Sequence, residues 1–179
     1  MRKTPKNHTE ALLIMHLSSL DVYSDVHGAK KAAVMAERLI DAMSSHHGPV
    51  IVVDMLWETG RHHDSEAREE IYERALFPML DQGTAILIVH DEGWESDFSW
   101  QGKPLSECVD EEMGYTGYWP EFFQELIPVL NELGVDSIRM GGFWYDPEHD
   151  HGCALAAGTY LSSMFDVRYD EKILGRAYS

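Results

Sequence analysis

Cys153 is the residue of this sequence best suited to act as a nucleophile, because it follows Gly152 at the point where a helix is expected to begin. The surrounding sequence predicts a buried strand over residues 137–140, a break at 141–142, a polar loop, this helix and a last strand over 167–169. At a helix N-terminus, unpaired N–H groups and the positive end of the dipole stabilise a thiolate. Cys153 is therefore a candidate nucleophile, and a small buried residue of a core helix is the alternative.

Polar side chains also follow three earlier strands of the expected fold. The strands cover residues 11–15, 50–53 and 85–89, and the polar residues after them are His16, then Asp54 and Glu58, then His90, Asp91 and Glu92. In an open parallel sheet, ligands bind outside the carboxyl ends of the strands, where loops and helix N-termini meet. We therefore expect these side chains and Cys153 at one edge of the sheet. Helix capping by ordinary polar loops is the alternative explanation.

Apolar runs that alternate along the chain with segments of helical periodicity predict the fold class. Runs such as residues 11–15 are typical of parallel strands covered by helices on both faces, which indicates an α/β three-layer αβα sandwich around a mostly parallel, Rossmann-like sheet. Helices are expected over 28–45, over about 64–76 with an end at Pro78, and over 120–133, with a loop at 17–27. The inward face of the first of these helices should hold Ala32, Ala33, Ala36, Leu39, Ile40 and Met43.

The chain length favours one domain. At 179 residues the sequence can enclose one sizeable core. We expect a flexible arm over residues 1–10, a single α/β domain over 11–179, and a lid or insertion at about 91–119. Glycines and aromatic residues interrupt any period in that insertion, so at most one short helix is expected there, near 105–112.

Charge and cysteine content exclude several classes of partner. The formal charge of −17 repels nucleic acid and anionic membrane surfaces, and no stretch approaches the ~20 apolar residues of a membrane span. Cys108 and Cys153 form no disulfide framework, so a cytoplasmic location is expected. The partners expected are a small-molecule substrate and further copies of the chain, which would associate through Phe122-Phe123 and the aromatic residues of 91–119.

Two histidine clusters raise the question of a bound metal. One is His149-Asp150-His151 beside Cys153, and the other is His62-His63-Asp64. Imidazole and thiolate are good ligands for zinc, whereas alternate residues of an acidic loop can equally remain solvated. The sequence contains no GxGxxG, GxxxxGK[ST], GxSxG, CxxC or HExxH motif. We therefore expect no cofactor and no metal, with zinc as the alternative.

The sequence resembles the isochorismatase-like cysteine hydrolases, which include the nicotinamidase and N-carbamoyl amide hydrolase branches. The likeness extends from about Ala11 to Ile173 and rests on layout more than on exact motifs. It is carried by ALLIMH at 11–16 and HGPVIVV at 47–53 for the first two strands, NELGVDSIRMGG at 131–142 before the nucleophile, GCALAA at 152–157 for its helix, and FDVRY at 165–169 for the following strand.

This resemblance implies a trio of Asp, Lys and Cys. Cys153 matches the cysteine, whereas His16 stands at the Asp position and His90 at the Lys position, with Lys103 as an alternative to His90. The loop over residues 146–153 is also longer than the usual one in the family. A neutral imidazole can accept a thiol proton, and an imidazolium lowers the pKa of a neighbouring thiol. We therefore expect His16 to act as base and His90 as an electrostatic or acid partner.

The function predicted is hydrolysis of a small amide or related carbonyl compound through Cys153. Backbone N–H groups over residues 152–154 would hold the oxyanion. The side chains expected to wall the pocket are Trp57, Trp94, Trp144 and Tyr145. Two alternatives remain open, a catalytically inactive ligand-binding or scaffolding member of the same fold and a metal-dependent hydrolase that uses the histidine-rich edge.

Overall fold

The computed structural model describes residues 9–56, 66–91, 96–100, 103–104, 119–148 and 152–176. Seven strands form one sheet in the order β5-β4-β3-β2-β1-β6-β7. Their bounds are β1 Thr9–Met15, β2 Val50–Leu56, β3 Ala85–Asp91, β4 Ser96–Trp100, β5 Lys103–Pro104, β6 Val135–Phe143 and β7 Asp166–Gly175. Five neighbouring strands, β3, β2, β1, β6 and β7, are parallel. On the outer side of β3, β4 and β5 extend the sheet in antiparallel fashion. The mostly parallel sheet predicted from the apolar runs is confirmed.

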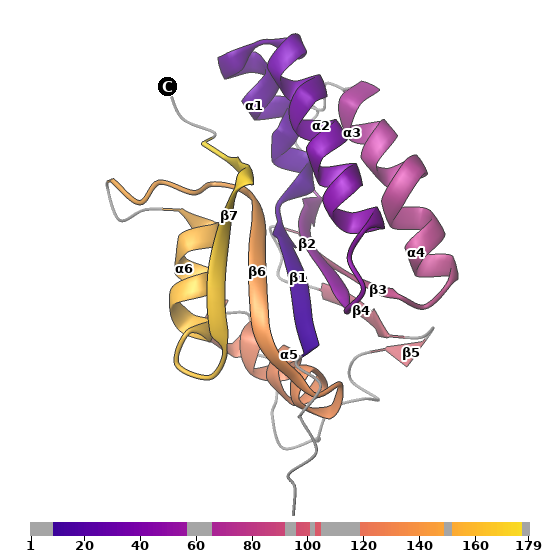
Figure 1. Cartoon of the computed structure of the whole chain (residues 1–179), viewed down its shortest axis with the longest axis vertical. Helices are drawn as coiled ribbons and strands as arrows, with labels where there is room; N and C mark the ends of the chain where they lie inside the picture. Colours follow the sequence, from indigo (N-terminus) through magenta and orange to yellow (C-terminus); the bar gives the residue numbers. More distant parts are fainter. Residues whose placement is uncertain are drawn as a thin grey trace, which may run out of the picture.

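Helices cover both faces of this sheet (Figure 1). One face carries α1 Leu20–His27, α2 Ala29–Ser44, α3 Glu66–Ile71 and α4 Phe77–Asp81, and the other carries α5 Trp119–Glu132 and α6 Cys153–Leu161. A 3-10 turn, η1 Leu17–Ser19, precedes α1, and a π-helical turn, η2 Tyr72–Leu76, joins α3 to α4. The expected three-layer αβα sandwich is therefore present.

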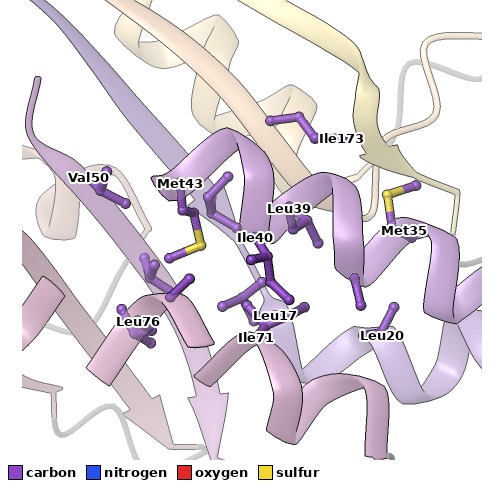
Figure 2. Packing of buried hydrophobic residues seen from close by; sticks show 14 of the residues in the cluster. Leu17, Leu20, Met35, Leu39, Ile40, Met43, Val50, Ile71, Leu76 and Ile173 are labelled. Carbon is purple, nitrogen blue, oxygen red and sulfur yellow. The ribbon is translucent and has the colours of Figure 1, made fainter. Parts of the chain in front are cut away.

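Two apolar cores lie on the two faces, and β1 contributes to both. Leu13 and Met15 point into the core under α5 and α6, whereas Leu12 and Ile14 point into the core under α2 and α3. Figure 2 shows the second core, in which α2 packs its apolar side against the sheet. The buried residues of α2 are Ala32, Met35, Ala36, Leu39, Ile40 and Met43. The inward position expected of Ala33 is wrong: Ala33 is exposed, and Met35 is buried instead.

Three expectations about the elements are wrong. Residues 17–27 form η1 and α1 rather than a loop, because Leu17 and Leu20 are fully buried in the core. The segment is too short to show a helical period in the sequence. The helix expected to end at Pro78 continues past it, through the π-helical turn into α4. Pro78 stands in the first turn of α4, where a proline needs no N–H partner. The expected break at residues 141–142 lies inside β6, which runs on to Phe143.

Glycine at position 141 reflects close packing rather than a turn. A Cβ atom there would lie 2.5 Å from Ile173 Cδ1 and 2.9 Å from Ile14 Cδ1. The insertion at 91–119 also differs from expectation, since it contributes the strands β4 and β5 to the sheet. The short helix expected near 105–112 lies outside the described residues. At the start of the domain, β1 begins at Thr9, inside the arm expected over residues 1–10. None of the helices in the described ranges is long and apolar enough to cross a bilayer.

Candidate active site

The carboxyl ends of the neighbouring strands β1 and β6 carry the two strained backbone positions of the described chain. His16, directly after β1, has φ 54°, and Trp144, directly after β6, has φ 63°. These are the non-glycine residues with positive φ among those that the structure describes. A left-handed conformation costs an L-residue roughly 1–2 kcal/mol, and such strain clusters at functional sites. This edge of the sheet is therefore the candidate active site.

The main chain of His16 is hydrogen-bonded to two neighbouring segments. Its N–H donates to the carbonyl of Val53 in β2 at 2.6 Å, and its carbonyl accepts from the N–H of Ser19 in η1 at 3.0 Å. The residue is 1% exposed, which makes it one of three buried polar or charged side chains in the described chain, with Ser19 and Asp54. The structure thus places His16 at the end of β1, as predicted, while its role as a base stays a prediction.

Asp54 follows the apolar run of β2 and is bound by the protein itself. Its Oδ1 accepts the N–H of Ser18 at 2.9 Å, and its Oδ2 accepts the hydroxyl of Tyr72. Burial and the adjacent Asp54 carboxylate raise the pKa of Tyr72 far above the usual tyrosine value, so the hydroxyl remains a donor. Asp54 therefore ties η1 and the π-helical turn to β2. Sequence reasoning placed Asp54 at this edge but missed Tyr72, which appeared only as one residue of an expected helix.

Trp144 connects the segment after β6 to two other parts of the site. Its indole Nε1 donates to Oγ of Ser19 at 2.5 Å, and its carbonyl accepts the N–H of Ala154 in α6 at 3.2 Å. Gly152 permits this approach, since a Cβ atom there would lie 1.9 Å from the Trp144 carbonyl oxygen. The expected oxyanion donors at residues 152–154 therefore include one N–H, that of Ala154, which already has a backbone acceptor.

Cys153 is the first residue of α6, as predicted, and is partly buried. Burial raises the pKa of its thiol, against the smaller opposing effect of a hydrogen bond from its own backbone N–H. The hydrogen bond from the first N–H of the helix favours the thiolate, but desolvation of the charged form is the larger effect. A thiol of this kind is protonated at neutral pH and needs a base before it can attack a carbonyl carbon.

The two aromatic residues of the predicted pocket that the structure describes lie against opposite cores. Trp144 packs against the core under α2 and α3, whereas Tyr145 packs against the core under α5 and α6. The Tyr145 ring lies 5.0 Å from that of Tyr169 in β7, measured between centroids. Their predicted contact with substrate stays a prediction, and only one of them, Trp144, is bonded to the segment that follows His16.

The remaining predicted residues are described in part or not at all. His90 lies near the end of β3, opposite Met55 of β2, and Lys103 lies in β5; both are described by their backbone alone. Trp57 and Trp94 lie outside the described residues, as do His62-His63-Asp64 and His149-Asp150-His151. Within the ranges that are described, no group of three His, Cys, Asp or Glu residues could hold a metal ion.

Comparison with known proteins links this geometry to a fold. No protein-family model matches the sequence, and neither does any curated protein sequence. Among solved structures, a nicotinamidase from Staphylococcus aureus matches over 94% of this chain and 85% of its own, with 13% identity and a TM-score of 0.52.

Two further solved structures are similar at lower scores. An N-carbamoylsarcosine amidase from Thermoplasma acidophilum matches over 93% of this chain and 84% of its own, with 14% identity and a TM-score of 0.49. A ribonuclease from Caenorhabditis elegans matches over 99% and 69%, with 17% identity and a TM-score of 0.48. The likeness to the nicotinamidase, together with the five parallel strands flanked by helices, shows that this chain has the isochorismatase-like α/β fold that its sequence resembles.

Proposed function

We propose that the protein is a hydrolase that acts on a small amide or related carbonyl compound through Cys153. The observation that carries this proposal is the position of the thiol, on the first residue of α6, next to an N–H group that hydrogen-bonds the loop leaving β6. The fold shared with a nicotinamidase supports it. Cys153 also matches the cysteine of the trio that the sequence resemblance implies.

The proposed reaction has two stages. In the first, the His16 imidazole accepts the thiol proton, and sulfur forms a bond to the carbonyl carbon of the amide. The tetrahedral intermediate then expels the amine, which takes the proton from the imidazolium, and a thioester remains. In the second, water attacks the thioester while His16 accepts its proton; the carbon–sulfur bond then breaks, the sulfur takes that proton back from the imidazolium, and the carboxylic acid leaves. His90 is proposed as an electrostatic or acid partner.

The raised thiol pKa gives the base a definite task. Because burial disfavours the thiolate, sulfur becomes nucleophilic only when the proton moves to a neighbouring group as the carbon–sulfur bond forms. The N–H groups of Gly152 and Cys153 at the start of α6 would stabilise the oxyanion, while the N–H of Ala154 keeps its hydrogen bond to the Trp144 carbonyl. Trp57, Trp94, Trp144 and Tyr145 are proposed to surround the small substrate. No cofactor is needed for these steps.

The test measures ammonia release from nicotinamide and from a panel of small primary amides. Cys153→Ala is expected to abolish release while its melting temperature stays near that of the wild type. Cys108→Ala serves as the matched control, with turnover unchanged, and dialysis against a chelator should leave turnover unchanged as well. A Cys153→Ala protein that keeps full turnover but melts much earlier would assign Cys153 to packing.

A non-catalytic ligand-binding or scaffolding role is the second candidate. It is favoured by the replacement of the Asp and Lys of the implied trio and by the protonated state of the thiol. This role predicts no release of ammonia from any amide of the panel, together with a rise in melting temperature when a small ligand binds, since a ligand bound to the native state stabilises it.

A further inference from the structure

We propose that Trp144 is a positioning residue that fixes the first turn of α6, and with it Cys153, against the segment that follows His16. This inference rests on the proposed function for its catalytic meaning, whereas the contacts that carry it are structural. Trp144 was expected only as one wall of the pocket. Its contacts instead extend in two directions, one through the indole and one through the main chain.

The indole reaches the segment after β1. Its Nε1 donates to the hydroxyl of Ser19 at 2.5 Å, and Ser19 is buried, with 3% of its surface exposed. The N–H of Ser19 in turn donates to the carbonyl of His16 at 3.0 Å. A buried hydrogen bond between a side-chain donor and this hydroxyl holds the ring in one orientation, because either group would lose a partner if the ring turned away.

The main chain of Trp144 reaches α6. Its carbonyl accepts the N–H of Ala154 at 3.2 Å, one residue after Cys153. The left-handed conformation of Trp144, with φ 63°, turns its carbonyl toward the helix, and the absence of a Cβ atom at Gly152 leaves room for it. The first turn of α6 is thus tied to Trp144 by its backbone.

Together these contacts form a chain of three hydrogen bonds from His16 to the residue beside Cys153. The chain runs from the His16 carbonyl to Ser19, from the Ser19 hydroxyl to the Trp144 indole, and from the Trp144 carbonyl to Ala154. The two residues proposed as base and nucleophile are far apart in sequence, so a covalent link does not set their separation. Trp144 is the residue in this chain that bonds to both segments, and it therefore sets how the start of α6 lies relative to β1.

The test follows alkylation of Cys153 by iodoacetamide across pH, read peptide by peptide by mass spectrometry so that Cys108 is counted separately. The variants are Trp144→Phe, which keeps a large ring without the N–H donor, Ser19→Ala, which removes the acceptor, and the double variant. Ser162→Ala is the matched control, because it removes a serine hydroxyl that makes a hydrogen bond elsewhere, to the carbonyl of Thr159 at the other end of α6. All are compared below their melting temperatures.

Loss of the bond between the indole and Ser19 lets residue 144 turn, which loosens its carbonyl from the Ala154 N–H. The sulfur then becomes hydrated and the N–H is free, and both effects favour the thiolate. Each single variant is therefore expected to lower the pH midpoint of alkylation and to speed the reaction at neutral pH by about three- to tenfold. The double variant should show no further change, because both substitutions break the same bond. Ser162→Ala should behave like the wild type.

Two results would overturn the inference. One is a wild-type midpoint in either single variant, and the other is a double variant whose shift equals the sum of the two single shifts. Ammonia release from nicotinamide and the amide panel separates this inference from the proposed function. If the wild type releases none but the alkylation pattern holds, the positioning role stands and the hydrolase proposal fails. If the wild type turns over, kcat should fall in Trp144→Phe and Ser19→Ala although their thiols alkylate faster, because base and sulfur are no longer held together.

Discussion

The carbonyl oxygen of Trp144 lies 3.2 Å from the backbone nitrogen of Ala154, and it can do so because residue 152 is glycine. Gly152 has φ 117° and ψ 152°, a region open almost only to glycine, and an added Cβ atom would lie 1.9 Å from that oxygen. We predict that Gly152→Ala lowers the free energy of unfolding by about 3 kcal/mol or more, measured by urea denaturation.

Gly28→Ala is the control for this prediction. Gly28 has a similar backbone, φ 89° and ψ 149°, but no atom lies within 4 Å of the Cβ position. Its substitution by alanine should cost only the conformational strain, on the order of 1–3 kcal/mol. Equal losses in the two variants would mean that the Trp144 carbonyl moves aside without cost.

Asp54 is predicted to stabilise the fold by holding η1 and the π-helical turn against β2. Asp54→Ala leaves the Ser18 N–H and the Tyr72 hydroxyl without their acceptor, and we expect a loss of about 3–5 kcal/mol in the free energy of unfolding. Asp25→Ala, an exposed aspartate of α1, should change it by less than about 0.5 kcal/mol. A small effect of Asp54→Ala would show that water satisfies both donors.

Tyr72 is predicted to make stability depend on alkaline pH. Its pKa is raised in the folded protein by burial and by the Asp54 carboxylate, so above pH 10 the native state holds a proton that the unfolded chain releases. Unfolding therefore becomes easier as pH rises, by about 1.4 kcal/mol per pH unit above 10 from this group. Tyr72→Phe should have a lower free energy of unfolding than the wild type at pH 8, and that free energy should change less between pH 9 and 11, as measured by urea denaturation at each pH. Parallel curves for the two proteins would contradict the shift.

Two arginine ion pairs are predicted to differ in their effect on stability. Arg68 lies 3.1 Å from Asp21, and the two side chains are 17% and 12% exposed, so the pair joins α3 to α1 in a partly buried position. We expect Arg68→Ala to lower the free energy of unfolding by about 2–3 kcal/mol, because the carboxylate is left without its partner in a partly buried position.

Arg74 provides the comparison. It contacts Glu37 at 2.5 Å, but the two side chains are 47% and 51% exposed, and water and salt screen their attraction. Arg74→Ala should give a denaturation curve that cannot be distinguished from that of the wild type at moderate salt. A loss as large as that of Arg68→Ala would mean that exposure does not govern these pairs.

The sequence predicted the central strands and α2 well because their signal is local. A continuous apolar run such as Leu12 to Ile14 can be accommodated only between two covered faces, and the spacing of Leu39, Ile40 and Met43 fits one side of a helix. The same reasoning missed α1, where Leu20 is the one buried residue of the helix, and it missed β4 and β5, whose pairing with β3 is a contact between segments.

For the candidate site, the sequence by itself determined which residues leave the strands and where α6 begins, since Gly152 ends the loop and Cys153 opens the helix. Only the tertiary structure decided that Asp54 is bound by Ser18 and Tyr72, that the Cys153 thiol is disfavoured as a thiolate by burial, and that Trp144 bonds to both Ser19 and Ala154. Hydrophobic periodicity and glycine preferences are properties of neighbouring residues, whereas desolvation and long-range hydrogen bonds arise only when the sheet places β1 beside β6.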